Sequence, residues 1–127
     1  QMNSFNHYSL GSVGEWLFRH VAGIELDPEV PGYARFVLRP FIAAGLDHAH
    51  ATYRSPRGEI ASHWRRAGER LVWEVTVPPN TTAQIFIPSE PGTDVESDGL
   101  VVDRREGRFA QCTAPAGRYR FTSVFRV

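Results

Sequence analysis

The sequence has one cysteine and no lysine, and the scarcity of cysteine already excludes one class of protein. Cys112, the only cysteine among 127 residues, cannot form an intramolecular disulfide, so no disulfide framework holds this fold. No second cysteine or clustered histidine provides the ligand spacing of a zinc site. We therefore predict no metal site and no cofactor, and we expect Cys112 to be a small buried apolar residue.

The chain also lacks a charge bias and a long apolar run. Fourteen basic and fourteen acidic residues give a formal net charge of zero, so nothing attracts a phosphate backbone and we expect no nucleic-acid partner. No apolar run approaches the ~20 residues of a membrane span, so we expect no membrane partner. No signal peptide opens the chain, and both a cytoplasmic and a secreted location stay open.

Residues 9–22 have the periodicity of a helix that is apolar around most of its circumference. Apolar side chains recur there at three- and four-residue steps, and two aromatic residues widen the stripe: Leu10, Val13, Leu17, Val21, Trp16 and Phe18. Gly23 follows as a plausible C-cap. A helix that is apolar on most sides normally packs against several neighbouring elements. The rest of the sequence shows no pattern of a second helix. We therefore expect the chain to be a piece of a longer protein.

After residue 23 the pattern changes to short strands that are separated by turn residues. Strands are predicted over 33–38, 47–55, 59–66, 70–77, 82–87, 108–113 and 119–127, with two short runs, 93–97 and 100–103, on either side of Asp98-Gly99. About eight strands at this spacing predict an antiparallel β-sandwich of jelly-roll or Greek-key type. The expected organisation is a mainly β protein, with a helical segment over 1–23 and a β-sandwich domain over 24–127.

Two sets of residues resemble one known family. The first is residues 2–18, Met-Asn-Ser-Phe-Asn-His-Tyr-Ser-Leu-Gly-Ser-Val-Gly-Glu-Trp-Leu-Phe. It resembles the last barrel segment of the bacterial α-L-rhamnosidases of glycoside hydrolase family 78. The second comprises residues 32–40, 51–60 and 77–83, the last of which reads Val-Pro-Pro-Asn-Thr-Thr-Ala. It is similar to the β-sandwich that follows the (α/α)6 barrel in that family.

The resemblance implies a parent enzyme that hydrolyses terminal α-L-rhamnosides with inversion, so its partner is an L-rhamnose-containing glycoside. Inversion needs an acid and a base carboxyl group about 6.5–9.5 Å apart. In the family both lie upstream of the first segment, so no catalytic residue carries over and we expect the isolated chain to be inactive. His7 matches a histidine of the sugar pocket and is expected to contact substrate. Asn6 borders that pocket, although it could also cap the helix.

Two other functions stay open for the chain by itself. An autonomous carbohydrate-binding module would need an exposed aromatic platform, for which Tyr53, Trp64 and Trp73 are the candidates. Trp73 and Trp64 alternate with apolar residues on their strands, which favours a place in the core. A structural module is the other alternative, in which the apolar helix docks on a partner or on a second copy of the chain.

The remaining polar candidates have simple structural explanations. His48 and His50 share a strand face and, with His63, could bind a metal, but no carboxylate stands at a matching offset, so we predict a solvated face. Glu15 lies in mid-helix without a second carboxylate nearby and is predicted to be a buried, hydrogen-bonded residue. The glycosylation pattern that begins at Asn80 is explained by a turn.

Overall fold

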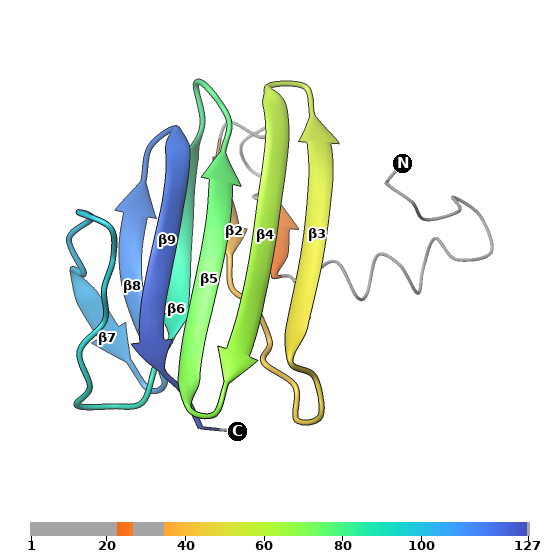
Figure 1. The fold of residues 1–127 in the computed structure, drawn as a ribbon. Helices are drawn as coiled ribbons and strands as arrows, with labels where there is room; N and C mark the ends of the chain where they lie inside the picture. Colours follow the sequence, from red (N-terminus) through yellow and green to blue (C-terminus); the bar gives the residue numbers. More distant parts are fainter. Residues whose placement is uncertain (1–22, 27–34, 127) are drawn as a thin grey trace.

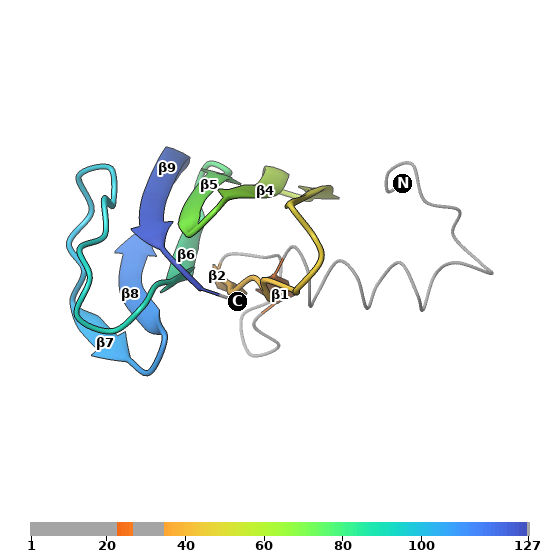
Figure 2. The ribbon, with the colours of Figure 1, turned by 60° about the horizontal axis from the view of Figure 1, so that its bottom comes forward.

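The structure, a computed structural model, describes residues 23–26 and 35–126, which form two sheets packed face to face (Figures 1 and 2). Within these residues there are nine strands: β1 (Ile24–Leu26), β2 (Arg35–Leu38), β3 (His48–Ser55), β4 (Gly58–Ala67), β5 (Arg70–Val77), β6 (Thr82–Pro88), β7 (Arg104–Glu106), β8 (Phe109–Ala114) and β9 (Gly117–Val124). No described helix is long and apolar enough to cross a membrane.

The two sheets confirm the prediction of a mainly β, largely antiparallel fold. One sheet has five strands in the order β1-β2-β6-β8-β7, and the other has four in the order β3-β4-β5-β9. All strand pairs between these elements are antiparallel except β2 with β6, which is parallel. A parallel pair needs a long connection, and here β3, β4 and β5 in the opposite sheet provide it.

Alternating side chains on each strand build the core between the sheets. On β5, Leu71, Trp73 and Val75 are buried whereas Arg70 and Glu74 are exposed, as the sequence predicted. The inward-facing residues of the other strands, together with Ile42 and Phe125 from outside the strands, complete one core cluster: Ile24, Phe36, Leu38, Ile42, Ile60, Trp64, Leu71, Trp73, Val75, Val77, Ala83, Ile85, Ile87, Ala110, Cys112, Ala114, Phe121 and Phe125. Burial of this apolar area is the main stabilising term of the fold.

Trp73 lies at the centre of that core. Its side chain has no exposed surface, and its ring centroid is 5.6 Å from that of Phe121 on β9. The indole Nε1 donates a hydrogen bond to Oγ of Ser62 on β4 at 2.9 Å, which satisfies a polar group that burial would otherwise leave without a partner. Trp73 thus connects three strands of the four-stranded sheet.

The prediction of strands over 93–97 and 100–103 was wrong. Residues 91–103 form a loop with one isolated β-bridge, between Glu96 and Thr122 of β9, and the short strand β7 begins only at Arg104. Val95, Leu100 and Val102 gave these runs their strand-like appearance. They are only partly buried and pack against the core from a loop, so their apolar character reflects contact with the core rather than strand pairing.

A close backbone contact fixes the start of the described chain. Gly23 has φ +82°, and its carbonyl oxygen accepts a hydrogen bond from the backbone N–H of Arg39 at 2.7 Å. Strand β1, which the sequence did not predict, follows immediately and pairs with β2. The predicted helix over 9–22 lies outside the described residues, so the helix and the C-cap role of Gly23 stay predictions.

Glu90 joins the end of β6 to the end of the chain. Its Oε2 accepts hydrogen bonds from Nη2 of Arg108 at 2.5 Å and from the backbone N–H of Arg126 at 2.7 Å. Arg108 also lies 4.2 Å from the ring centroid of Phe125 and hydrogen-bonds the carbonyl of Arg126. The hydrogen bonds from Arg126 and Arg108 lower the pKa of Glu90 from its ordinary value.

This cluster predicts an acid-sensitive contribution to stability. The folded-state pKa of Glu90 lies below the unfolded value near 4.5, so its charged form stabilises the domain above that pH. The contribution is lost as the pH falls through the folded-state pKa. We expect Glu90→Gln to lower the urea midpoint at neutral pH and to differ less from wild type in acid. Glu106→Gln, on the exposed strand β7, is the control, and a pH-independent effect of Glu90→Gln would contradict the assignment.

Candidate functional site

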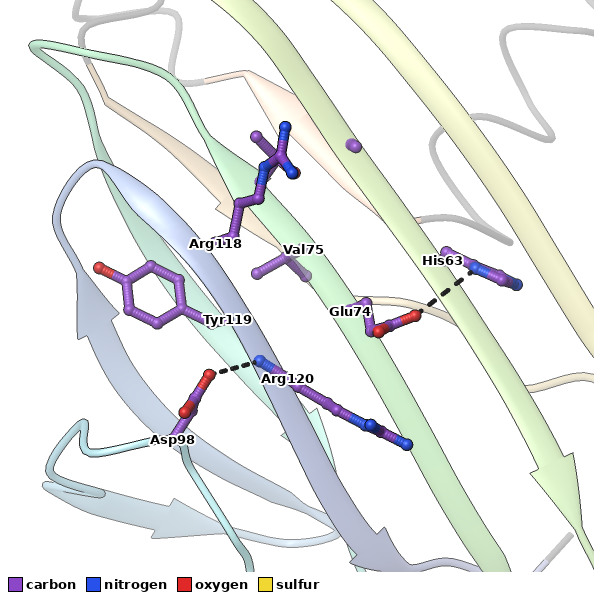
Figure 3. Close-up of a pocket in the computed structure, with 9 residues that line it drawn as sticks. His63, Glu74, Val75, Asp98, Arg118, Tyr119 and Arg120 are labelled. Carbon is purple, nitrogen blue, oxygen red and sulfur yellow. Dashed lines mark hydrogen bonds and ion pairs between the residues drawn. The ribbon is translucent and has the colours of Figure 1, made fainter.

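A groove lined by several charged and polar side chains lies on the outer face of the four-stranded sheet (Figure 3). Its volume is about 280 Å³. Strands β4, β5 and β9 and the loop before β7 contribute the residues that line it: Ala61, His63, Glu74, Val75, Thr76, Asp98, Arg118, Tyr119 and Arg120. A hollow of this size and polarity has room for one small polar molecule.

The register of the sheet explains why these side chains meet. Residues in register on neighbouring antiparallel strands point to the same face. One row across the sheet is His63, Glu74 and Arg120, and the next row is Ala61, Thr76 and Arg118. Ala61 and Thr76 have small side chains, so the second row creates the empty space of the groove. The long side chains of Arg118 and Arg120 border that space.

The groove contains charges of both signs. Oε1 of Glu74 lies 3.7 Å from Nη1 of Arg65 and 3.9 Å from Nδ1 of His63. Oδ2 of Asp98 accepts a hydrogen bond from the backbone N–H of Arg120 at 2.9 Å, and Asp98 has φ +56°. In the described part of the chain, the guanidinium groups of Arg118 and Arg120 have no ion pair. The groove therefore offers both donors and acceptors to a ligand.

Two groups that line the groove have shifted pKa values. Burial and the neighbouring His50 lower the pKa of His63, which favours its neutral imidazole. Burial and the nearby carboxylate of Asp98 raise the pKa of Tyr119. The hydroxyl of Tyr119 donates a hydrogen bond to the carbonyl of Pro115 at 2.8 Å, so it is already engaged at the rim of the groove.

The three histidines lie on the outer sheet face, as predicted. His48 and His50 are exposed, and His63 is partly exposed. The sequence argument missed Glu74, which stands directly opposite His63 on the next strand. Only the pairing of the two strands shows that proximity. The structure places the tight turn at Gly68-Glu69, with Ala67 opposite Arg70, whereas the turn predicted at Ala67-Gly68 would have put His63 opposite Val72.

The aromatic residues proposed as a sugar platform lie mainly in the core. Trp64 and Trp73 have no exposed surface, which confirms the prediction that they are core residues. Tyr53 is only partly buried and packs against the same core. Alternation on β6 instead turns Phe86 outward, where its ring contacts Phe109 with centroids 6.0 Å apart and Arg39 lies over it at 5.0 Å. The sequence argument overlooked this outer-face aromatic pair.

The minor candidates have the roles that the sequence predicted. Cys112 is buried, and burial together with Asp103 raises the pKa of its thiol to about 11, so the thiol stays protonated and unreactive at neutral pH. Asn80 has φ +59° in a turn, and Oγ1 of the next residue, Thr81, donates a hydrogen bond to the carbonyl of Pro78 at 2.5 Å. That turn accounts for the Pro-Pro-Asn sequence.

The residues predicted to contact sugar are outside the described part of the chain. His7 and Asn6 belong to residues 1–22, as do Glu15 and Trp16. Their proposed roles therefore stay predictions. The groove on the sheet is argued from described residues alone and is a separate candidate.

Comparison with known proteins decides the family. Residues 23–101, more than half of the chain, match the family model of the bacterial alpha-L-rhamnosidase C-terminal domain. The chain belongs to this family. The match covers β1 to β6 and the loop that contributes Asp98 to the groove, so both sheets of the rhamnosidase C-terminal domain are represented in it.

Curated relatives of this rhamnosidase C-terminal domain are much longer proteins. The alpha-L-rhamnosidase of Streptomyces avermitilis is 38% identical over 122 residues, which is 96% of this chain and 12% of that protein. The alpha-L-rhamnosidase of Formosa agariphila is 37% identical over 133 residues, which is 98% of this chain and 14% of that protein. The chain thus spans about an eighth of the length of these relatives.

Solved structures show the same fold. A crystal structure of the Streptomyces avermitilis alpha-L-rhamnosidase complexed with L-rhamnose matches 95% of this chain and 12% of that chain, with a TM-score of 0.80 and 38% identity. An alpha-L-rhamnosidase from Dictyoglumus thermophilum matches 88% of this chain and 13% of that chain, with a TM-score of 0.76 and 21% identity, which supports the fold alone.

Proposed function

We propose that this chain is the C-terminal part of an α-L-rhamnosidase that hydrolyses terminal α-L-rhamnosides with inversion. The observation that carries the proposal is the family match over residues 23–101, together with relatives that are alpha-L-rhamnosidases and align with almost the whole chain. The acid and base carboxyl groups would lie in the larger, upstream part of the protein. This chain would supply structural support and a substrate contact.

The two predicted parts of the chain would divide this role. Residues 1–23 would form the last helix of the helical catalytic barrel and present His7, with Asn6 beside it, to the sugar. An imidazole can donate and accept hydrogen bonds with its two nitrogens, which suits a sugar hydroxyl. Residues 24–127 would form the β-sandwich that packs beside the barrel and stabilises it.

The alternative of an autonomous carbohydrate-binding module loses its main support in the described residues. Sugar-binding platforms need aromatic faces that are open to solvent, and neither Trp64 nor Trp73 has exposed surface. An amide NMR titration with L-rhamnose tests what remains of this alternative. We expect no saturable shifts on the sandwich strands, and saturable shifts there would favour the module.

A chimera tests the proposed function. The corresponding C-terminal segment of the Streptomyces avermitilis alpha-L-rhamnosidase would be replaced by this chain, and hydrolysis of an aryl α-L-rhamnoside would be measured. We expect an active chimera in which His7→Ala raises KM about tenfold or more, because loss of a hydrogen bond to substrate costs about 1–3 kcal/mol. Asn6→Ala should have a smaller effect if Asn6 caps the helix.

Matched controls separate this function from mere folding. His48→Ala, on the outer sheet face of the sandwich, should leave the KM of the chimera unchanged. A chimera that unfolds cooperatively but shows no activity, or one in which His7→Ala has wild-type KM, would contradict the proposal. The isolated chain should not turn over the aryl rhamnoside, and clear turnover by it would contradict the expected upstream location of the catalytic carboxyl groups.

A further inference from the structure

The outer face of the four-stranded sheet carries a histidine pair that spans two neighbouring strands. His50 on β3 stands directly opposite His63 on β4, with ring centroids 4.9 Å apart and an angle of 32° between the ring planes. Two imidazoles that bind one tetrahedral ion through nitrogens at about 2.0–2.1 Å have ring centres about 5 Å apart. The pair therefore already has the spacing that a shared ion requires.

A carboxylate stands on the far side of this pair. Glu74 on β5 is in register with His63, and its Oε1 lies 3.9 Å from Nδ1 of the His63 ring. Figure 3 shows the ring of His63 with its other nitrogen directed away from Glu74, on the side of β3. A carboxylate beside one ring nitrogen of a ligand histidine orients the ring and leaves the other nitrogen for the metal.

We propose that His50 and His63 form a two-histidine site for a divalent transition-metal ion, with Glu74 orienting His63. In the part of the chain that the structure describes, no group of three or more histidine, cysteine, aspartate or glutamate side chains could hold a metal. Two protein ligands would therefore bind the ion and water would fill its other positions. Such an ion would join β3, the edge strand of its sheet, to β4.

The surroundings select the kind of ion. Imidazole nitrogen suits zinc, copper and nickel, whereas magnesium and calcium need several oxygen ligands. The nearest carboxylate, Glu74, already shares its charge with Arg65, whose Nη1 lies 3.7 Å from Oε1 of Glu74. Because the site offers two nitrogens and no uncommitted carboxylate, it should discriminate strongly against Mg²⁺. Zn²⁺, which is diamagnetic, is the suitable probe.

An amide NMR titration of the 127-residue chain with Zn²⁺ tests the site. We expect saturable shifts centred on β3 and β4, which separates this pair from histidines outside the described residues. Each of His50→Ala and His63→Ala should weaken the binding seen at these strands about 100-fold, because a second ligand on the same scaffold acts at high effective concentration. Glu74→Gln should weaken it about tenfold.

His48→Ala is the matched control. His48 is exposed on the same face of β3 as His50, but it stands opposite Arg65 rather than a histidine. This variant should bind Zn²⁺ within twofold of wild type, and excess Mg²⁺ should produce no shifts at β3 or β4. Hydrogen exchange of β3 amides should slow in wild type with Zn²⁺ and stay unchanged in His63→Ala.

Several outcomes would overturn the proposal. Wild-type affinity in His50→Ala or His63→Ala would do so, as would an equal loss in His48→Ala or the same shifts with Mg²⁺. Because His50 is exposed and His63 partly exposed, their substitution should leave the amide spectrum elsewhere and the thermal midpoint unchanged. If His63→Ala perturbs the fold, His63→Gln retains most of the side-chain volume and provides the same comparison.

Discussion

Trp73→Ala is expected to lower the free energy of unfolding by about 3–5 kcal/mol, the usual cost of removing a buried indole. The side chain is fully buried, contacts Phe121 and donates a hydrogen bond to Ser62. Its removal would therefore leave a cavity, and the buried hydroxyl of Ser62 would lose this hydrogen bond. Because domains are stable by only about 5–15 kcal/mol, this loss would remove a large fraction of the free energy of unfolding. Urea unfolding followed by far-ultraviolet circular dichroism measures the loss.

Two further substitutions make this result specific. Trp73→Phe keeps an aromatic ring but loses the hydrogen bond, and we expect it to be intermediate. Phe41→Ala removes an aromatic ring of which 59% is exposed, and it should change stability by less than about 0.5 kcal/mol. If Trp73→Ala cost no more than Phe41→Ala, Trp73 would not be the centre of the core.

Gly23→Ala is expected to be the second most damaging substitution, with a loss of about 2–4 kcal/mol. A Cβ at Gly23 would lie 2.3 Å from the carbonyl carbon of Arg39 and 2.3 Å from the nitrogen of Pro40, and both are backbone atoms. The backbone of Gly23 also has φ +82°, which disfavours any side chain. Relief of the clash would separate Gly23 from Arg39 and break their 2.7 Å hydrogen bond.

Gly68→Ala is the matched control for that clash. Gly68 also has a positive φ, +63°, but an added Cβ there would meet no atom within 4 Å. It should therefore show only the conformational cost, about 1 kcal/mol. The difference between the two alanine variants in urea unfolding measures the steric part, and equal losses would show that Gly23 does not approach Arg39 closely.

The sequence predicted strands best where large apolar residues recur at every second position. The strand 70–77 was predicted with the bounds that the structure shows, because Leu71, Trp73, Val75 and Val77 mark its inner face even though Val72, on the other face, is also buried. Residues 93–103 were mistaken for strands because Val95, Leu100 and Val102 pack on the core from a loop. The strand pairing was harder still, since nothing in residues 35–38 or 82–88 shows that β2 and β6 lie parallel.

For the candidate sites, too, the sequence predicted which face of a strand a residue occupies but not which residues on neighbouring strands lie together. Sequence alternation placed Trp64 and Trp73 in the core, and it placed His48 and His50 on one face of a strand. It could not place Glu74 beside His63, because that contact depends on the register of two strands and not on distance along either one. The sequence argument against a metal site at His48, His50 and His63 relied on the lack of a carboxylate nearby. In the structure, Glu74 lies 3.9 Å from His63.

The parallel contact between β2 and β6 also has a consequence for folding kinetics. The two neighbours are separated in sequence by all of β3, β4 and β5, which form most of the other sheet. Pairing between distant segments requires closure of a large loop before any contact compensates for the lost entropy. During synthesis β2 must therefore wait until β6 has emerged, so the five-stranded sheet should form late, on a template that the β3–β4–β5 hairpins provide.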